Sequence, residues 1–374
     1  MPVSLVFLAF GLATAVTASS NAPTQAPAFL SHLQRSTAAC GVRGRARRRT
    51  TCRLAETEGE TLTLFSPSKV NLFLRILRRR PDNYHDLASL FQTISLGDSL
   101  SFSALPTGAS ADVLTCTDSS VPTDGSNLVV KAFDLFRRKS GKNKFFRCHI
   151  DKKVPNQAGL GGGSGNAATA LFAAARLTAS GDGAVSQEDL LKWSADIGSD
   201  ITFFLSGGTA YCTGRGEIVE PLAALPHAPP CLYVVKPDEG LSTPLVYKSL
   251  DLSALSPEDP DGLLRCFCAE TADRWRLVND LEPPALKNLP SLKTLKGEMG
   301  ELYGVQEGKG LENTVMMSGS GTAVFSLGEP VGGKEAFKKF VADRPTLRAW
   351  RCTFVNRPGN SPEQWFEETT VEPL

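Results

Sequence analysis

The sequence lacks the long apolar runs and the cysteine spacings that would place it in a membrane or around a zinc ion. Beyond residue 16, no uninterrupted apolar stretch reaches the roughly 20 residues that a membrane-spanning helix needs. The nine cysteines are odd in number and include no Cys-x2-Cys pair and no Cys/His cluster with zinc spacing. We therefore expect a soluble mature protein in a reducing compartment, without a structural disulfide or a zinc site.

Acidic residues are absent from the first part of the chain, where no Asp or Glu occurs before Glu56. Leu5 to Val16 is a short apolar run followed by small residues, as at a signal-peptidase site, although no basic residue precedes it. Seven arginines and many Ala, Ser and Thr residues follow, a composition typical of transit peptides. A signal peptide followed by a transit peptide resembles the two-part address of proteins sent to a plastid of secondary origin. The alternative is a basic arm at Arg45 to Arg49 that binds nucleic acid.

Net charge changes sign if this leader is removed. The full chain has 40 Lys and Arg against 39 Asp and Glu, a net charge of +1. Without residues 1–53, which contain seven arginines and no acid, 33 basic residues stand against 39 acidic ones, a net charge of −6. A mildly acidic body argues against nucleic acid as a partner. We assign residues 1–56 to the leader, 57–224 and 230–358 to two domains joined by a proline-rich linker, and 359–374 to a frayed tail.

The body of the chain is organised around a glycine-rich stretch that leads into an alanine-rich helical run. Five of the seven residues from 159 to 165 are glycines, and a β-like run over 146–154 precedes them. A glycine-rich turn that begins a helix points free N–H groups and the positive end of the helix dipole at one place, which suits a phosphate. The alternative is a flexible linker, which the flanking helix and strand patterns disfavour.

Two common phosphate loops do not fit this stretch. The Walker loop needs a lysine after its last glycine, where Asn166 stands, and the dinucleotide pattern needs a glycine where Ser164 stands. The segment Pro-x3-Gly-Leu-Gly-Gly-Gly-Ser instead resembles the loop of the GHMP kinases, and its triple glycine resembles their 4-diphosphocytidyl-2-C-methyl-D-erythritol kinase branch. The resemblance implies that ATP is held by Pro155, Ala158, Gly159, Leu160, Gly161, Gly162, Gly163, Ser164 and Gly165.

The same resemblance implies Mg2+ as a cofactor that bridges the β- and γ-phosphates of ATP. These kinases often carry two serines after the glycines, and here Gly165 stands in place of the second one. Ser164 is therefore the candidate ligand for the metal or for a phosphate.

Two ionisable residues, far apart in the sequence, carry the catalytic hypothesis. In Ser-Pro-Ser-Lys-Val-Asn-Leu, strand alternation places Lys69 and Asn71 on one face. The segment is similar to a kinase motif whose lysine and asparagine contact the substrate at the reacting hydroxyl. Asp200, in Gly-Ser-Asp-Ile-Thr-Phe-Phe, resembles the aspartate that takes the proton of that hydroxyl, so the resemblance implies a general base with Lys69 as its electrostatic partner. From the residues alone, Lys69 could be a surface charge and Asp200 the N-cap of a turn over 201–205.

Aromatic residues carry the hypothesis of pyrimidine recognition. Arg-Pro-Asp-Asn-Tyr-His resembles the family's Arg-Pro-Asp-Gly-Tyr-His loop, and Asn83 can adopt the positive φ of the usual glycine. The resemblance implies that Tyr84 and Tyr247 stack on cytosine, each base–aromatic contact contributing about 1–3 kcal/mol, while His85 reads its edge and Thr243 makes a polar contact nearby. The alternatives are a half-buried surface patch at Tyr84 and His85 and a helix-core role for Tyr247.

A second glycine-rich turn precedes a strand near the end of the chain. Ser318, Gly319, Ser320 and Gly321 match the third GHMP motif, which implies that they brace the phosphate loop and contact substrate. The alternative is a simple hairpin turn. Asn279 to Pro283 is similar to a family helix start and is expected to be structural.

Local patterns predict further elements. Ser126 and a Ser186–Asp189 capping box are expected to begin helices, and residues 106–125 to form turns. We expect strands over 61–66, 70–77, 90–95, 99–105, 145–152, 231–236 and 347–355, and helices over 128–139 and 334–342.

The resemblance covers roughly residues 62–326 and implies both a fold and a reaction. The fold is α+β, a two-domain GHMP kinase fold with an amino-terminal mixed α/β domain, a ferredoxin-like carboxy-terminal domain and the active site in the cleft between them. The reaction is transfer of phosphate from ATP to the 2-hydroxyl of 4-diphosphocytidyl-2-C-methyl-D-erythritol, a small cytidine-diphosphate-linked polyol, in the non-mevalonate isoprenoid (terpenoid) pathway. We expect a monomer or weak homodimer in the plastid stroma, with no nucleic-acid or membrane partner.

Two other functions remain open from the residues. Another GHMP kinase, of the homoserine or mevalonate type, would not need Tyr84, His85 and Tyr247, because its substrate has no base to stack. A catalytically silent relative acting as a ligand sensor would not need both Lys69 and Asp200.

Overall fold

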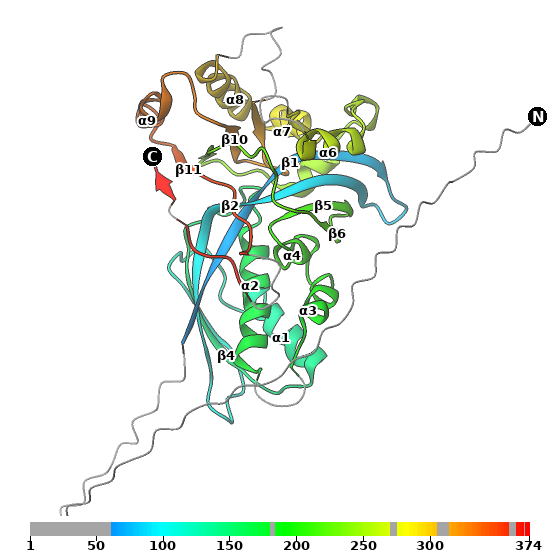
Figure 1. Ribbon diagram of the computed structural model, residues 1–374, viewed down its shortest axis with the longest axis vertical. Coiled ribbons are helices and arrows are strands. Elements are labelled where there is room, and N and C mark those ends of the chain that lie inside the picture. The colour runs from blue at the N-terminus through cyan, green and yellow to red at the C-terminus, as the bar shows by residue number, and fades with distance from the viewer. Residues whose placement is uncertain (1–60, 180–183, 270–274, 305–313, 359–363, 370) are drawn as a thin grey trace, which may run out of the picture. The chain divides into compact units, whose positions relative to one another are not determined.

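Figure 1 shows the computed structural model of the chain, which describes residues 61–179, 184–269, 275–304, 314–358, 364–369 and 371–374. The leader predicted over residues 1–56 lies outside these ranges. Residues from Thr57 to Leu374 are grouped in one compact unit. Within the described ranges, no helix combines the length and the apolar character needed to cross a lipid bilayer.

The first sheet is mixed and has seven strands among the described residues. Two long antiparallel strands, β1 (Leu62–Arg79) and β2 (His85–Ala104), form its centre. The other edge of β2 is shared, because β5 (Thr209–Gly214) pairs with its first half and β4 (Phe146–Asp151) with its second half. The remaining strands are β3 (Val113–Cys116), parallel to β4; β6 (Ile218–Pro221), antiparallel to β5; and β8 (Val278–Asn279), parallel to β1.

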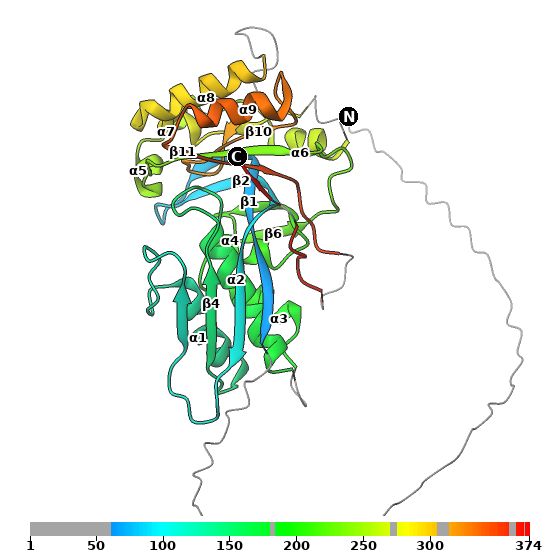
Figure 2. The same cartoon turned by 90° about the vertical axis from the view of Figure 1, so that its left-hand side faces the viewer.

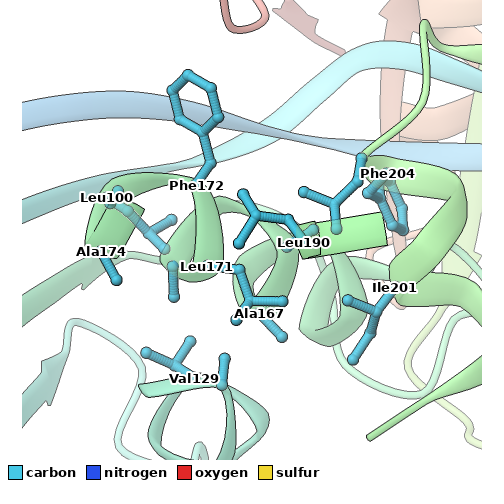
Figure 3. Close-up of a cluster of buried hydrophobic side chains, with 14 of the residues drawn as sticks. Leu100, Val129, Ala167, Leu171, Phe172, Ala174, Leu190, Ile201 and Phe204 are labelled. Atoms are coloured by element: carbon cyan, nitrogen blue, oxygen red, sulfur yellow. The ribbon is translucent and has the colours of Figure 1, made fainter. Parts of the chain in front are cut away.

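Helices pack on one side of this sheet around a shared core. They are α1 (Leu128–Ser140), α2 (Gly162–Leu177), α3 (Gln187–Ser194) and α4 (Ser199–Phe204). In α2 every residue from Gly165 to Ala174 is buried, and half of them are alanines. Small side chains let α2 lie close to its neighbours, and Figure 3 shows its Ala167 and Leu171 between Leu100 of β2 and Val129 of α1. The glycine-rich stretch is thus anchored by a rigid, buried helix.

The second sheet is antiparallel and, in the described part of the chain, has the order β12-β11-β7-β10-β9. Its strands are β7 (Leu232–Pro237), β9 (Val315–Met317), β10 (Val324–Leu327), β11 (Leu347–Cys352) and β12 (Glu372–Pro373). In chain order, the first four of these strands take the positions 4-1-3-2 across the sheet, which is the ferredoxin-like arrangement.

The helices of this second part are α5 (Thr243–Lys248), α6 (Pro260–Ala269), α7 (Glu282–Asn288), α8 (Pro290–Leu302) and α9 (Gly333–Ala342), with a 3-10 turn at Leu252–Ala254. Figures 1 and 2 show α8 and α9 on the face of the sheet that lies away from β1 and β2. The opposite face joins the first sheet through a continuous apolar core, in which Val70 and Leu72 of β1 belong to the same cluster as Val234 of β7 and Phe325 of β10. The predicted α+β architecture, mixed in its first part and ferredoxin-like in its second, is confirmed.

Several expected boundaries were wrong. The strands predicted over 61–66 and 70–77 are one strand, because Pro67, which has no N–H to donate, sits at a register shift that lets β1 continue. The strands predicted over 90–95 and 99–105 are likewise one strand, β2. The turn-rich segment 106–125 contains β3.

One predicted helix cap was also misplaced. The side chain of Asn127, not Ser126, accepts the backbone N–H of Val129 at the start of α1. The alternative role of Asp200 as an N-cap is excluded, because Gly198 precedes α4 and Asp200 lies in its first turn. The capping box of Ser186 and Asp189 is confirmed at α3.

The carboxy-terminal tail was predicted to be frayed, and its described residues are packed. Trp365 is buried in the core of the first sheet and donates its ring N–H to the carbonyl of Phe65 at 2.7 Å. Its ring stacks on Phe172 of α2, with 4.5 Å between the ring centroids, and the guanidinium of Arg357 lies 4.3 Å from its centroid. Further along, β12 extends the second sheet. Burial of the ring against apolar side chains and a hydrogen bond from its N–H together stabilise this position of the tail.

Candidate active site

Lys69 and Asp200 converge, although 131 positions separate them in the sequence. Lys69 comes from the register-shifted part of β1, and Asp200 from the first turn of α4. Lys69 Nζ lies 3.7 Å from Asp200 Oδ2. The lysine side chain is 5% exposed and the aspartate side chain 31% exposed. A buried cation therefore faces a carboxylate that solvent or a ligand can still reach.

The environment of Lys69 fixes its ammonium group. Nζ donates to Asn71 Oδ1 at 2.5 Å and lies 4.6 Å from the centre of the Phe91 ring. The contact between Lys69 and Asn71 is the one expected of two polar residues on one face of the strand. Asn71 in turn donates to Ser89 Oγ of β2 at 2.9 Å. Burial lowers the pKa of Lys69 from its ordinary value, and the charge of Asp200 opposes that shift. The site thus contains an ammonium held in place at low solvent access.

The glycine loop wraps around this pair. The main-chain N–H of Lys69 donates to the carbonyl of Leu160 at 2.9 Å, which ties the loop to β1. Gly159 and Gly161 have φ of +73° and +70°, and Gly161 is the residue before α2. A Cβ at Gly159 would collide with the carbonyl oxygen of Ser318, so only glycine fits there.

The start of α2 offers free main-chain donors. Its first intrahelical hydrogen bond runs from Gly165 N to Gly161 O at 2.9 Å, so the amides of Gly162, Gly163 and Ser164 have no intrahelical partner. Gly159 and Gly161 line the cavity next to Lys69, whereas the residues from 162 to 165 lie outside its lining. The side chains of Ala158 and Leu160 belong to the core between the sheets, and Pro155 is buried. Any contact of these three residues with a nucleotide would use the main chain.

The second glycine turn braces the first. Ser318 Oγ donates to Gly159 O at 3.1 Å, and Ala323 N donates to Ala158 O at 3.0 Å. Asn279 stabilises this turn, because its side-chain amide donates to the carbonyls of Met317 and Gly319, each at 2.8 Å. The sequence predicts a structural role for Asn279 at a helix start, and its Oδ1 also accepts the N–H of Leu281 just before α7. Its contact with the glycine turn is formed only by the fold.

Two adjoining cavities meet at Asp200. The first, of about 580 Å³, is lined by Lys69, Asn71, Gly159 and Gly161, and by the turn residues Gly319, Ser320 and Gly321. The second, of about 650 Å³, is lined by Tyr84 and His85. Asp200, Thr243 and Tyr247 line both cavities. Because residues of both sheet systems contribute to the first cavity, the predicted cleft between the two parts exists.

Aromatic rings form the wall of the second cavity. His85 stacks on Tyr247 with 5.3 Å between ring centroids, and burial lowers the pKa of His85 while it raises that of Tyr247 to about 12. Tyr84 is 57% exposed and lies against the guanidinium of Arg215. The two tyrosines therefore both border this cavity. Thr243 begins α5, and its hydroxyl lies 2.7 Å from Ser320 Oγ, which links this wall to the second glycine turn.

Sequence reasoning missed two residues of the site. Arg215, in the turn between β5 and β6, lines both cavities. Gln157 lines the first cavity with a φ of +52°, and its carbonyl accepts the N–H of Thr322 at 3.4 Å. Gln157 occupies a variable position of the Pro-x3-Gly motif and Arg215 lies in a polar turn, so only their places in space identify them.

The donor set near the glycine loop can be tested for a metal. Among the described residues, no group of three or more His, Cys, Asp or Glu side chains could by itself hold a metal ion. Ser164 is half-buried at the start of α2, and within the described part of the chain its hydroxyl has no hydrogen-bond partner. One hydroxyl suits an ion such as Mg2+ that receives most of its ligands from water and from nucleotide phosphates. The residues present fit a metal that arrives with ATP rather than a resident metal.

Comparisons with known proteins agree with this geometry. The family model described as the GHMP kinases N terminal domain matches residues 127–208, which include the glycine loop and Asp200. The chain is 49% identical over 312 residues to the chloroplastic 4-diphosphocytidyl-2-C-methyl-D-erythritol kinase of Arabidopsis thaliana, an alignment that covers 82% of this chain and 76% of the relative. It is 43% identical to the kinase of the same name from Protochlamydia amoebophila (strain UWE25), over 82% of this chain and 93% of the relative.

This chain belongs to the 4-diphosphocytidyl-2-C-methyl-D-erythritol kinase family. A crystal structure of 4-(cytidine 5'-diphospho)-2C-methyl-D-erythritol kinase matches it with a TM-score of 0.61 at 33% identity, over 78% of this chain and 99% of the other. A homoserine kinase from Cytophaga hutchinsonii ATCC 33406, at 15% identity and a TM-score of 0.57, covers 80% of this chain and 96% of its own and shares the fold alone.

Membership of this kinase family makes the chain a GHMP kinase and a phosphotransferase, with ATP as the co-substrate. The plant relatives are named chloroplastic, which agrees with the plastid address predicted for the leader. The two-part form of that address falls on residues outside the described ranges.

Proposed function

We propose that this chain transfers the γ-phosphate of ATP to the 2-hydroxyl of 4-diphosphocytidyl-2-C-methyl-D-erythritol, giving the 2-phosphate and ADP. The reaction would serve the non-mevalonate isoprenoid pathway. The observation that carries the proposal is the position of Lys69 and Asp200, 3.7 Å apart, between a cavity bordered by a glycine loop and a cavity bordered by aromatic rings. The name shared by relatives at 43–50% identity supports the choice of substrate.

Phosphoryl transfer depends on positioning and charge neutralisation more than on covalent catalysis. Asp200 orients the 2-hydroxyl and accepts its proton as the oxygen bonds to the γ-phosphorus, while the bond from that phosphorus to the β-phosphate bridging oxygen breaks. Lys69 neutralises the charge that develops on the attacking oxygen, and Asn71 keeps the ammonium directed at it. Because Asp200 is partly exposed and Lys69 is buried, the acceptor reaches the carboxylate while the ammonium stays shielded from water.

The loop from Pro155 to Gly165 and the start of α2 would hold the ATP phosphates through main-chain N–H groups. Mg2+, bound with the nucleotide and through Ser164, would neutralise phosphate charge. Gly159 is held by Ser318, so the second glycine turn would keep this loop in place when the nucleotide binds.

Recognition of cytosine would use the second cavity. Tyr247 presents a ring already paired with His85, and Tyr84 borders the same cavity. A cytosine placed there could stack on either phenol ring, with His85 at its edge and Thr243 as a nearby polar contact. Homoserine and mevalonate have no base, so this wall distinguishes the proposal from the other GHMP kinases.

We propose further that the mature chain acts in the plastid stroma as a monomer or weak homodimer, after a signal peptide and a transit peptide have been removed. The composition of residues 1–56 supports this address, since they contain seven arginines and a single acid, Glu56.

Replacement of Asp200 by Asn tests the mechanism. The amide keeps the size of the side chain and removes the base, so we expect kcat to fall by about 10²- to 10⁴-fold with the cytidine-bearing acceptor, while ATP binding stays at the parent level. Asp196→Asn is the matched control, because Asp196 is an exposed acid four residues away that pairs with Lys139. Turnover by Asp200→Asn near the parent rate would remove Asp200 from the base role. Parent protein that binds ATP but phosphorylates no acceptor would favour the ligand sensor, and turnover of an acceptor without cytidine would favour another GHMP kinase.

A further inference from the structure

Arg215 occupies the junction between the two cavities. It follows Gly214 and precedes Gly216, whose φ values of +69° and +111° make the tight turn between β5 and β6. Six residues line both cavities: Leu87, Asp200, Arg215, Thr243, Pro244 and Tyr247. Arg215 is the single cation among these six.

The guanidinium of Arg215 is held in place by the protein but leaves hydrogen-bond donors unused. It lies 5.2 Å from the centre of the Tyr84 ring, which holds it at the side of the second cavity. Its Nε is buried and, among the described residues, has no hydrogen-bond partner. Glu217 forms an ion pair with it, with Oε1 3.6 Å from that Nε, which is beyond hydrogen-bond range. An arginine with unused donors beside a cavity is well suited to an anionic ligand.

The other cations of the two cavities are less suitable for this role. Lys69 is buried, donates to Asn71 and faces Asp200. Arg79 and Lys248 line the second cavity but not the first, and Arg79 donates to Asn83 at 3.0 Å. If a ligand places its base in the second cavity and its hydroxyl at Asp200, the group that links them would lie near Arg215, which lines both cavities.

We propose that Arg215 binds the diphosphate of the acceptor and so sets the preference for a nucleoside diphosphate over an uncharged nucleoside. This proposal rests on the proposed function, because it assigns a residue to the anionic part of that substrate. The diphosphate brings negative charge close to Asp200, and the guanidinium offsets this repulsion with paired N–H donors. Because it lies over the Tyr84 ring, Arg215 also joins recognition of the base to recognition of the phosphates.

Arg215→Gln tests the proposal by binding and by kinetics. Titration with CDP and with cytidine should show that the parent prefers CDP and that the variant loses about 10- to 100-fold of its CDP affinity, with cytidine affinity unchanged. The KM for the diphosphate acceptor should rise by a similar factor, whereas kcat and the KM for ATP stay within about threefold of the parent. Arg215→Lys should restore part of the CDP affinity, because it keeps the charge and loses the fork of donors.

Lys248→Gln is the control, since it removes a cation that lines the second cavity alone. It should leave the preference for CDP over cytidine near the parent value. Equal losses for CDP and cytidine in Arg215→Gln, or an unchanged CDP affinity, would overturn the role of Arg215 while leaving the proposed function intact. Parent protein that binds neither CDP nor cytidine and does not phosphorylate the acceptor would overturn both proposals.

Discussion

Gly165 offers a sharp test of how tightly the glycine loop is packed on β1. This buried residue lies within the first turn of α2. A Cβ added there would lie 2.7 Å from the carbonyl oxygen of Pro67 and 3.2 Å from Ser66 Oγ. The first of these atoms belongs to the backbone, so Gly165→Ala requires β1 to shift at Pro67, which is two positions before Lys69.

Two opposing effects set the magnitude. Alanine is favoured over glycine inside a helix by about 1 kcal/mol. Overpacking of a tight core costs about 1–3 kcal/mol, and this contact is against main chain that cannot rotate away. We therefore expect Gly165→Ala to lower the free energy of unfolding by about 1 kcal/mol, and kcat to fall about tenfold because Lys69 is displaced from Asp200.

Gly163→Ala is the matched control in the same helix. Its added Cβ would meet only Leu128 Cδ1 within 4 Å, at 3.8 Å, which is ordinary van der Waals contact. It should raise the free energy of unfolding by about 0.5–1 kcal/mol. Urea unfolding of both variants and steady-state kinetics of Gly165→Ala provide the comparison. Equal stability of the two variants, with kcat of Gly165→Ala at the parent value, would refute the packing argument.

Two further predictions concern the buried lysine and the tail. Burial lowers the pKa of Lys69, so its charge is lost as pH rises through a value below the ordinary 10.5. The alkaline limb of the kcat/KM profile should therefore appear below pH 10.5. A limb at or above pH 10.5 would contradict this. In that window the folded protein binds fewer protons at Lys69 than the unfolded chain does, so this residue makes stability rise with pH, and Lys69→Met should remove that rise in urea-unfolding measurements. Trp365→Ala should lower the free energy of unfolding by about 3 kcal/mol, because the ring packs on Phe172 and donates a hydrogen bond to the carbonyl of Phe65. Replacement of the exposed Glu368 by Ala should change it little. Equal stability of the two variants would mean that the Trp365 contacts do not stabilise the fold.

Local chemistry made much of the site predictable. The spacing of Lys69 and Asn71 determines that they share a face. Glycine is required at 159 and 161 by the positive φ of the turn, and at 165 by the nearby carbonyl of Pro67. The resemblance then connected Asp200 to Lys69, a contact that no local pattern contains. Helices with clear boundaries, such as those begun by Ser186 and at Gly333, were also predicted from their sequence.

Features that depend on distant partners were not predictable. Trp365 is ordered by Phe65, which lies 300 positions earlier, and nothing in the tail sequence reveals that partner. Arg215 lies in a polar turn after a strand, and it becomes a candidate site residue only because the fold places it where the two cavities adjoin. Pro67 normally ends a strand, but pairing along β2 continues past it through a register shift. In each case tertiary contacts override the local preference.

The main chain joins the two halves of the site directly. Leu160 accepts from Lys69 of the first sheet, while Ala158 accepts from Ala323, next to β10 of the second sheet. A hinge that swung the two sheets apart would have to break these links, so we expect the protein to admit its ligands without such a swing. Access should then depend on short surface segments such as the Arg215 turn. Catalytic geometry would be preserved between turnovers instead of being rebuilt in each one.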